Sequence, residues 1–297
     1  MNNTLRAVPA AICLALSLPV QADEHLFGYV RGAEPLPAGA QELYQWITMR
    51  EDKGEGRYRA YNLATEYEYG WTHRFSTAAY LKAQAIDTRG LVIDGYLPGA
   101  EKYGIKLSGV EAEIKYNILS AAKDPIGLTL IVALEHDWLD PHSGRDKDTL
   151  SFETGLALQK YFLDGALIWA GNGAVESTYA DRKAIADLPP GFDWPTDPEM
   201  EIELQLGTGL SYRFAPNWFI GAEVQYETEF ETEVGQERWS WFGGPALHYG
   251  GKKWWATATW FPQLQGGGEI AYEGQPAHRH VVEKTLDEYR LKVGFNL

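Results

Sequence analysis

The last nine residues of the chain alternate without a break between apolar and polar side chains. In Tyr289–Leu297 every odd position is apolar, and every even position is polar or glycine. A period of two residues is typical of a β-strand that has one apolar face and one polar face. The fold of the chain therefore depends on what covers the apolar face of such strands.

The same alternation recurs upstream in runs of about 9–11 residues, which is the length of a tilted β-strand that crosses a bilayer. We predict twelve strands, near residues 40–50, 57–71, 75–87, 104–118, 126–138, 148–162, 165–178, 200–214, 217–231, 237–249, 253–264 and 284–297. In the strand near 200–214, for example, Leu204 and Leu206 share one face, while Glu203 is on the other.

The connections between these runs differ in length on the two sides. Connections on one side are short, at 72–74, 119–125, 163–164, 215–216 and 250–252. Those on the other side are mostly longer, at 88–103, 139–147, 179–199 and 265–283, with short exceptions at 51–56 and 232–236. Short turns at one end and long loops at the other are typical of transmembrane barrels, whereas a soluble β-sandwich has no reason to show them.

We therefore predict an all-β fold, a transmembrane antiparallel up-and-down β-barrel over residues 40–297, with short periplasmic turns and longer outer loops. The 17 Tyr, 11 Trp and 31 Gly suit this fold, as does a mean hydropathy of −0.32, because only alternate residues of each strand face lipid. An even number of strands places both ends of the barrel in the periplasm.

The first 22 residues have the features of a cleaved secretory signal. Arg6 supplies a positive start, residues 7–20 are mostly apolar, and Ala22 offers a small residue at the cut. Cys13 is the only cysteine, so the exported chain has no disulfide and no cysteine chemistry. Residues 23–39 contain Pro35 and Pro37 and are not strand-like, so this segment is either a periplasmic tail or a plug in the lumen.

The charge balance is acidic, with 41 Asp and Glu against 26 Lys and Arg and a formal net charge of −15. Such a surface repels polyanions, so we expect no nucleic-acid partner. No glycine-rich phosphate loop follows a strand and opens a helix, and we expect no cofactor.

The polar face of the strands predicts the residues that line the lumen. The acidic members are Glu66, Glu68, Glu111, Glu113, Glu135, Asp137, Glu153, Glu176, Glu201, Glu203, Glu223, Glu227, Glu229 and Glu231. The basic members are Lys82, Lys115, Arg213, Arg290 and Lys292. An excess of acids in a wide lumen favours cations and neutral solutes over anions, which predicts a passive channel. The alternative is that the bases bridge the acids and the lumen is packed shut.

Two short patterns are candidates for a catalytic site and for a metal site. The run Glu135–Asp140, at the outer end of a strand, resembles the acidic strand end of omptin-type outer-membrane proteases. The resemblance implies a surface protease with Glu135 and Asp137 as carboxylates, which activates water between this pair and an Asp-x-His pair on the opposite wall. The chain departs from that family: it has twelve predicted strands instead of ten, and no Asp-x-His triplet on the opposite wall. His278 and His280 are two apart and near Glu283, but two histidines are weak evidence for a metal, and a solvated loop is the simpler prediction. We predict no catalytic and no metal site.

The alternation, the signal and the turn asymmetry together resemble the porin-like outer-membrane barrels of Gram-negative bacteria. The run Gly28–Glu34, followed by Gln45 and Trp46, resembles an uncharacterised family of such barrels. The resemblance implies a place in the bacterial outer membrane, contact with membrane lipid and lipopolysaccharide, and insertion by the barrel assembly machinery. The chain differs from these barrels at its last residue: it ends on Leu297, whereas they usually end on an aromatic residue. Here the aromatic residue, Phe295, is two positions earlier.

A third hypothesis is a closed structural barrel that binds a partner through its outer loops. The loop 179–199, which contains Phe192, Trp194 and Pro195, is the best candidate for that contact. The sequence leaves the oligomeric state open.

Overall fold

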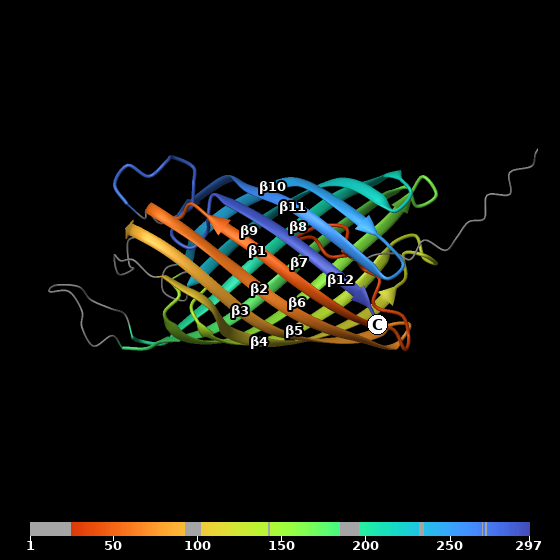
Figure 1. Ribbon diagram of the computed structural model, residues 1–297, viewed down its shortest axis with the longest axis horizontal. Helices are drawn as coiled ribbons and strands as arrows, with labels where there is room; N and C mark the ends of the chain where they lie inside the picture. Colours follow the sequence, from red (N-terminus) through yellow and green to blue (C-terminus); the bar gives the residue numbers. More distant parts are fainter. Residues whose placement is uncertain are drawn as a thin grey trace, which may run out of the picture.

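Twelve antiparallel strands form a closed barrel in which each strand pairs with its neighbours in sequence and the last pairs with the first (Figure 1). The computed structural model describes residues 25–92, 102–141, 143–184, 196–231, 235–268, 270 and 272–297. The strands are β1 Gln41–Glu51, β2 Glu55–Thr72, β3 Phe75–Val92, β4 Lys102–Leu119, β5 Gly127–Leu139, β6 Asp146–Phe162, β7 Leu167–Arg182, β8 Glu199–Ala215, β9 Trp218–Glu231, β10 Gly235–Gly250, β11 Trp254–Gly268 and β12 Asp287–Asn296. The predicted fold class is confirmed, while the predicted signal at residues 1–22 lies outside the described residues.

Each predicted strand corresponds to one observed strand, but several strands extend further at the end with the longer loops. β3 continues to Val92 instead of 87, β7 to Arg182 instead of 178, and β11 to Gly268 instead of 264. Above a bilayer both faces of a strand meet polar surroundings, so the backbone ladder continues where the alternation of side chains has ended. β12 starts later than predicted, at Asp287 instead of 284, because the residues before it fold into the barrel. In the part of the chain that the structure describes, no helix has the length and apolar character needed to span a bilayer.

The two faces of the strands differ in the way that the alternation predicts. On β2, Glu66 and Glu68 are fully buried inside the barrel, whereas Tyr61 and Tyr67 are exposed on the outside. The outer face of the barrel carries the exposed large apolar residues, such as Leu206 in the middle of β8. An apolar outer band around a polar interior is the arrangement that a lipid environment stabilises.

The N-terminal segment lies inside the barrel. Phe27, Val30 and Ala33 are buried there, and we call residues 25–37 the arch. Both ends of the arch are near the short-turn end of the barrel: residue 40 leads into β1, and His25 stacks on Trp255 at the start of β11 with ring centroids 4.6 Å apart. The middle of the arch reaches halfway up the lumen, where it contacts the strand walls (Figure 1, red).

The connection between β11 and β12 folds back into the opposite end of the barrel. Val281 and Val282 are each 2% exposed and pack against Tyr58 and Ala60 of β2 and Ile86 of β3. We call residues 272–286 the strap. The arch and the strap therefore enter the lumen from opposite ends.

Replacing an outward-facing residue with a charge tests the lipid-facing surface. We expect Leu206→Arg, in the middle of β8, to lower the free energy of unfolding in lipid vesicles by about 2–4 kcal/mol, because arginine is costly near the bilayer midplane. Met200→Arg, on the same face near the outer end of β8, should cost at most about 1 kcal/mol. Urea titration of the folded protein in vesicles measures the free energy of unfolding of both variants. An equal loss of stability in the two variants would contradict the placement of Leu206 near the bilayer midplane and of Met200 near its surface.

Candidate functional site

The lumen is the candidate functional site, and the arch is its main internal element. The carboxylate of Glu223 on β9 accepts hydrogen bonds from three consecutive backbone amides, those of Gly28 (2.7 Å), Tyr29 (2.8 Å) and Val30 (2.9 Å). Three amides that point at one carboxylate form an anion-binding nest, and hydrogen bonds to a charged group are stronger than neutral ones. Glu223 therefore holds the arch and is covered by it, so it is not a free lumen carboxylate.

Further polar contacts hold the rest of the arch. Asn172 on β7 accepts a hydrogen bond from the Arg31 amide at 2.6 Å and donates one to the Arg31 carbonyl at 2.9 Å. The Arg31 guanidinium pairs with Glu113 on β4. The amide of Ala33 donates to Gln159 on β6 at 2.8 Å, and its carbonyl accepts from Asn117 at 2.9 Å. Side chains of the wall thus bind the arch backbone as a neighbouring strand would.

Two glycines of β8 make room for the arch. A Cβ atom on Gly207 would lie 3.2 Å from Val30, and one on Gly209 would lie 2.7 Å from Phe27. Any side chain at position 209 would therefore displace Phe27. The absence of side chains on this part of β8 allows the arch to pack directly on the backbone of the wall.

Two of the predicted lumen bases contact aromatic rings. The Arg290 guanidinium lies 3.8 Å from the ring centroid of Tyr29, which stacks on Phe261 at 4.1 Å. The Lys292 ammonium lies 4.0 Å from the ring centroid of Trp46. Cation–π contacts of this kind keep both charges beside the arch instead of in an open pore.

The strap is tied to the opposite wall by ion pairs. The Lys284 ammonium lies 2.7 Å from Glu227 on β9 and 3.5 Å from Glu203 on β8. Burial alone would lower the pKa of Lys284, but these two carboxylates outweigh it and raise that pKa above its ordinary value. The strap lysine is therefore charged, and it neutralises part of the acidic wall formed by β8 and β9. Arg238 on β10 joins Glu283 of the strap (3.3 Å) to Glu229 of β9 (2.5 Å).

The two histidines of the strap occupy different surroundings. His278 is exposed, whereas His280 is 1% exposed and its backbone is held by Gln263. Burial, reinforced by the nearby charge of Arg238, lowers the pKa of His280 to about 3, so its ring is neutral. The prediction of a solvated loop is wrong at His280, because the strap folds into the barrel and buries this side chain. His278 is exposed to solvent, so the two histidines do not face a common site and do not suit binding of one metal ion.

The carboxylates of the omptin-type hypothesis are held by a lysine. Lys82 on β3 contacts Glu135 and lies 2.8 Å from Asp137 on β5. His136, between these two acids in sequence, is exposed on the outward face of β5. A lysine between the carboxylates opposes their use as a base for water, and His142 lies outside the described residues. The geometry therefore gives this hypothesis no support.

Four acids form a lateral row across the wall from β6 to β9. Glu153 lies opposite Glu176, Glu176 opposite Glu203, and Glu203 opposite Glu229 in the strand registers. Like charges directly opposite one another destabilise a sheet, so this row costs stability. Glu203 and Glu229 are paired with Lys284 and Arg238, whereas Glu153 has, among the residues that the structure describes, only the Arg31 guanidinium, at 4.0 Å.

A cavity lies beside the arch next to this row. Its volume is about 50 Å³, and it is partly open to solvent. The residues around it include Arg31 of the arch, Glu153, Asn172, Gln205 and Gln225. Polar side chains from four adjacent strands and the arch thus converge on one space at mid-height.

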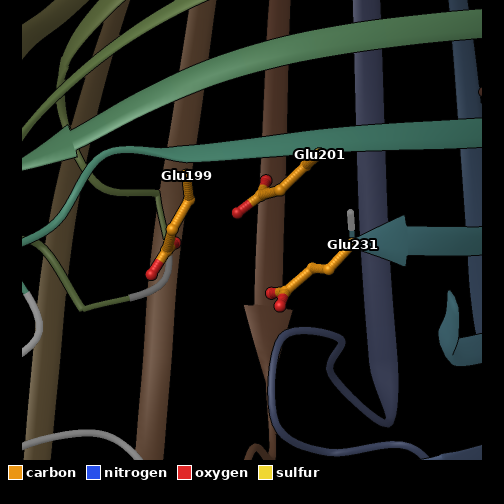
Figure 2. A group of neighbouring side chains, drawn as sticks. All are labelled: Glu199, Glu201 and Glu231. Carbon is orange, nitrogen blue, oxygen red and sulfur yellow. The ribbon is translucent and has the colours of Figure 1, made fainter. Parts of the chain in front are cut away.

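A second group of acids lies at the outer end of β8 and β9, where Glu199, Glu201 and Glu231 converge (Figure 2). One carboxylate oxygen from each lies within 4.8 Å of the others, and within the described residues this is the group that could hold a metal ion. Arg182 pairs with Glu199, and Lys147 lies 3.8 Å from Glu201, so bases already neutralise part of the group.

The residues predicted to line the lumen are all buried or half-buried on the inward side of their strands, but most of the charged ones face a specific partner. Lys115, for example, lies 3.1 Å from Glu68 and 3.5 Å from Glu113, while Arg213 is half-buried near the short-turn end of β8. Sequence reasoning missed several inner bases, among them Arg31, Lys53, Lys147, Arg238 and Lys284. The alternation of β10 could have identified Arg238, but Arg31, Lys53 and Lys284 lie outside the strands and leave no periodic signal.

A closed, twelve-stranded, up-and-down antiparallel barrel with an apolar outer band defines the class of outer-membrane-type β-barrels. The chain belongs to a family of unknown function, DUF6662, which matches residues 19–297. A comparison with curated proteins finds no match.

Solved structures with the same architecture are distant in sequence. The COG4313 outer membrane channel from Pseudomonas putida F1 is 10% identical, with 89% of this chain and 98% of that chain covered and a TM-score of 0.59. The beta domain of the Bordetella autotransporter BrkA is 14% identical, with 87% and 100% covered and a TM-score of 0.53. At these identities the similarity concerns the fold.

Removing the carboxylate that holds the arch tests its role as the anchor. Glu223→Ala leaves the amides of Gly28, Tyr29 and Val30 without their acceptor, and each unsatisfied buried amide costs about 1–3 kcal/mol. We expect a cysteine placed at Val30, which is 1% exposed, to resist a water-soluble thiol reagent in the otherwise unchanged protein and to react in the Glu223→Ala variant.

Glu227→Ala is the matched control, because Glu227 is on the same strand face but contacts the strap. Equal protection of the Val30 cysteine in the presence and absence of Glu223 would show that the other contacts suffice to hold the arch.

Proposed function

We propose that the protein is a passive channel of the bacterial outer membrane, exported with a cleaved signal, for small cationic or neutral solutes. The acidic row on β6–β9 beside a polar cavity carries this proposal, because a wall that retains like charges at a cost in stability is expected to interact with cations. Lipid and lipopolysaccharide would surround the apolar band, and the assembly machinery would insert the barrel.

The arch and the strap restrict the path of a solute. The arch packs against Ile168, Ala170 and Phe219 with Leu26 and Phe27, which fills the lumen towards the short-turn end. A solute passes through the space beside Arg31 only if the arch shifts or if the remaining gap is wide enough. We therefore propose a channel of low conductance, with the arch as its narrowest part.

The same packing favours a second candidate, a closed barrel that binds a partner through its outer loops. Ion pairs between bases and acids across the lumen, such as Lys284 with Glu203 and Glu227, are what a shut lumen requires. The loop residues of the proposed contact, Phe192, Trp194 and Pro195, lie outside the described residues. The absence of any conductance would favour this candidate over the channel.

The purified protein in a planar lipid bilayer tests the proposed function. We expect discrete conductance steps and, under a potassium chloride gradient, a reversal potential that shows preference for cations, because the acidic wall attracts them. A preference for chloride would contradict the proposal.

Loosening the strap should enlarge the current. Lys284→Met removes the charge that joins the strap to Glu203 and Glu227, so we expect several-fold more conductance and a stronger preference for potassium. Lys183→Met is the control, since this lysine is exposed and pairs with Asp148 at the outer end of the barrel at 3.1 Å. The two variants are compared in the same bilayers, and equal effects would argue against a restrictive strap.

A further inference from the structure

Four basic side chains gather on the outside of the barrel, at the outer ends of three adjacent strands, β2, β3 and β4 (left in Figure 1). They are Arg57, Arg59, Arg89 and Lys102, and their side chains are 40–69% exposed. Each is next in sequence to a residue that packs inside the barrel, so the alternation of the strands directs all four outwards. We call these four residues the basic patch.

The basic patch lies just above the lipid-facing band. On β2 the outward positions continue from Arg59 to Tyr61 and then along the strand to Trp71. The stretch from Tyr61 to Trp71 has the length that crosses the hydrocarbon core as a tilted strand, about 9–11 residues. On β4, Ile105 and Leu107 are 70% and 54% exposed on the bilayer side of the patch. The patch is therefore at the level of the lipid head groups, with apolar surface directly below it.

One acid serves three of these bases. Arg57, Arg89 and Lys102 surround the carboxylate of Asp87 on β3, at 3.6, 3.5 and 3.8 Å. These separations are longer than the charge-assisted hydrogen bonds that such groups form at about 2.7–2.9 Å. The three bases therefore keep donors that Asp87 does not satisfy, and they outnumber the acid that they share.

Two of the arginines face each other across the sheet. Arg57 is directly opposite Arg89 in the register of β2 and β3, and like charges in this position destabilise a sheet. Arg59 pairs with Glu51 of β1 and adds no net charge. An anion between Arg57 and Arg89 would remove their repulsion. The planar guanidinium matches phosphate in particular, because it can donate two parallel hydrogen bonds to two of its oxygens.

The surroundings of the patch are acidic or balanced in charge. Asp287 at the start of β12 and Glu55 at the start of β2 are acids at the same end of the barrel, and Lys183 pairs with Asp148 on the β6–β7 side at 3.1 Å. The chain as a whole carries a formal net charge of −15, so it repels free polyanions. The local excess of bases therefore suits an anion that is already held at the membrane surface.

We propose that the basic patch binds a phosphate group of lipid A, the phosphorylated and acylated part of lipopolysaccharide. The phosphate accepts hydrogen bonds from Arg57 and Arg89, Lys102 adds its charge, and an acyl chain lies along Ile105 and Leu107. A free phosphate ion would gain the charge but not the apolar contact. The inference does not require an open lumen, so it stands or falls separately from the proposed channel.

Native mass spectrometry of the purified full-length protein in a non-ionic detergent counts bound lipid molecules and tests the patch. Lipid A with both phosphates is compared with the same lipid A after removal of its phosphates. We expect the phosphorylated form to bind at least about tenfold more tightly, because hydrogen bonds between charged groups are the strong ones.

Three results would overturn the proposal. Equal binding of the two forms of lipid A would show that the phosphates are not recognised. Equal binding of phosphatidylglycerol would indicate a general preference for anionic lipid. Displacement of lipid A by inorganic phosphate at the same concentration would indicate a site for a free anion.

Variants test the two arginines. Arg57→Gln and Arg89→Gln should each weaken binding of lipid A about tenfold, since each removes a charged donor to the phosphate. Lys183→Gln is the matched control: it removes an exposed base at the same end of the barrel that has its own acid, and it should change binding less than about twofold. Equal weakening in all three variants would indicate diffuse attraction and would contradict a defined site.

Asp87→Asn should act in the opposite direction. It removes the carboxylate that competes with the phosphate for three bases, so we expect lipid A to bind several-fold more tightly. Damage to the fold would not strengthen binding, which separates recognition of the phosphate from a loss of stability. Unchanged or weaker binding in this variant would overturn the assignment of the phosphate to these bases.

Discussion

The structure depends on the need to pair every backbone amide and carbonyl where no water is present. In a bilayer an open sheet edge is prohibitively costly, so strands can cross it only as a closed ring. Pairing of β1 with β12 closes this ring, from Glu42 opposite Asn296 to Glu51 opposite Asp287. Closure then dictates the rest, because each strand must direct one set of side chains to lipid and the other set into a confined polar interior.

A confined polar interior must satisfy its own charges. Here the wall contributes mainly acids, and the bases that face them come both from strands, such as Lys115 and Arg238, and from Arg31 of the arch and Lys284 of the strap. The interior is therefore a negatively charged cylinder into which two segments fold, each with a basic side chain that pairs with acids of the wall. Glu153, beside Arg31, borders the cavity that lies next to the arch.

The strand positions and their faces could be predicted from the sequence because lipid imposes a strict period of two on the barrel wall. Glu66, Glu68 and Glu223 were assigned to the lumen by this period alone. Their partners could not be predicted in the same way. That Glu223 binds the amides of Gly28–Val30, 193–195 positions away, depends on how a segment without periodicity folds in three dimensions. The same limit applies to the strap, whose inward fold buries His280 in a region whose composition suggests a loop in water.

The anchoring of the arch has a consequence for how the protein matures. The arch is synthesised before any strand, yet its docking surfaces are on β4, β6, β7 and β9, which emerge from the ribosome later. It can settle only after those strands have met, so a segment that precedes the strands in sequence is the last to find its place. During that interval Leu26, Phe27 and Val30 are open to water, and exposed apolar surface of this kind makes a folding intermediate prone to aggregation.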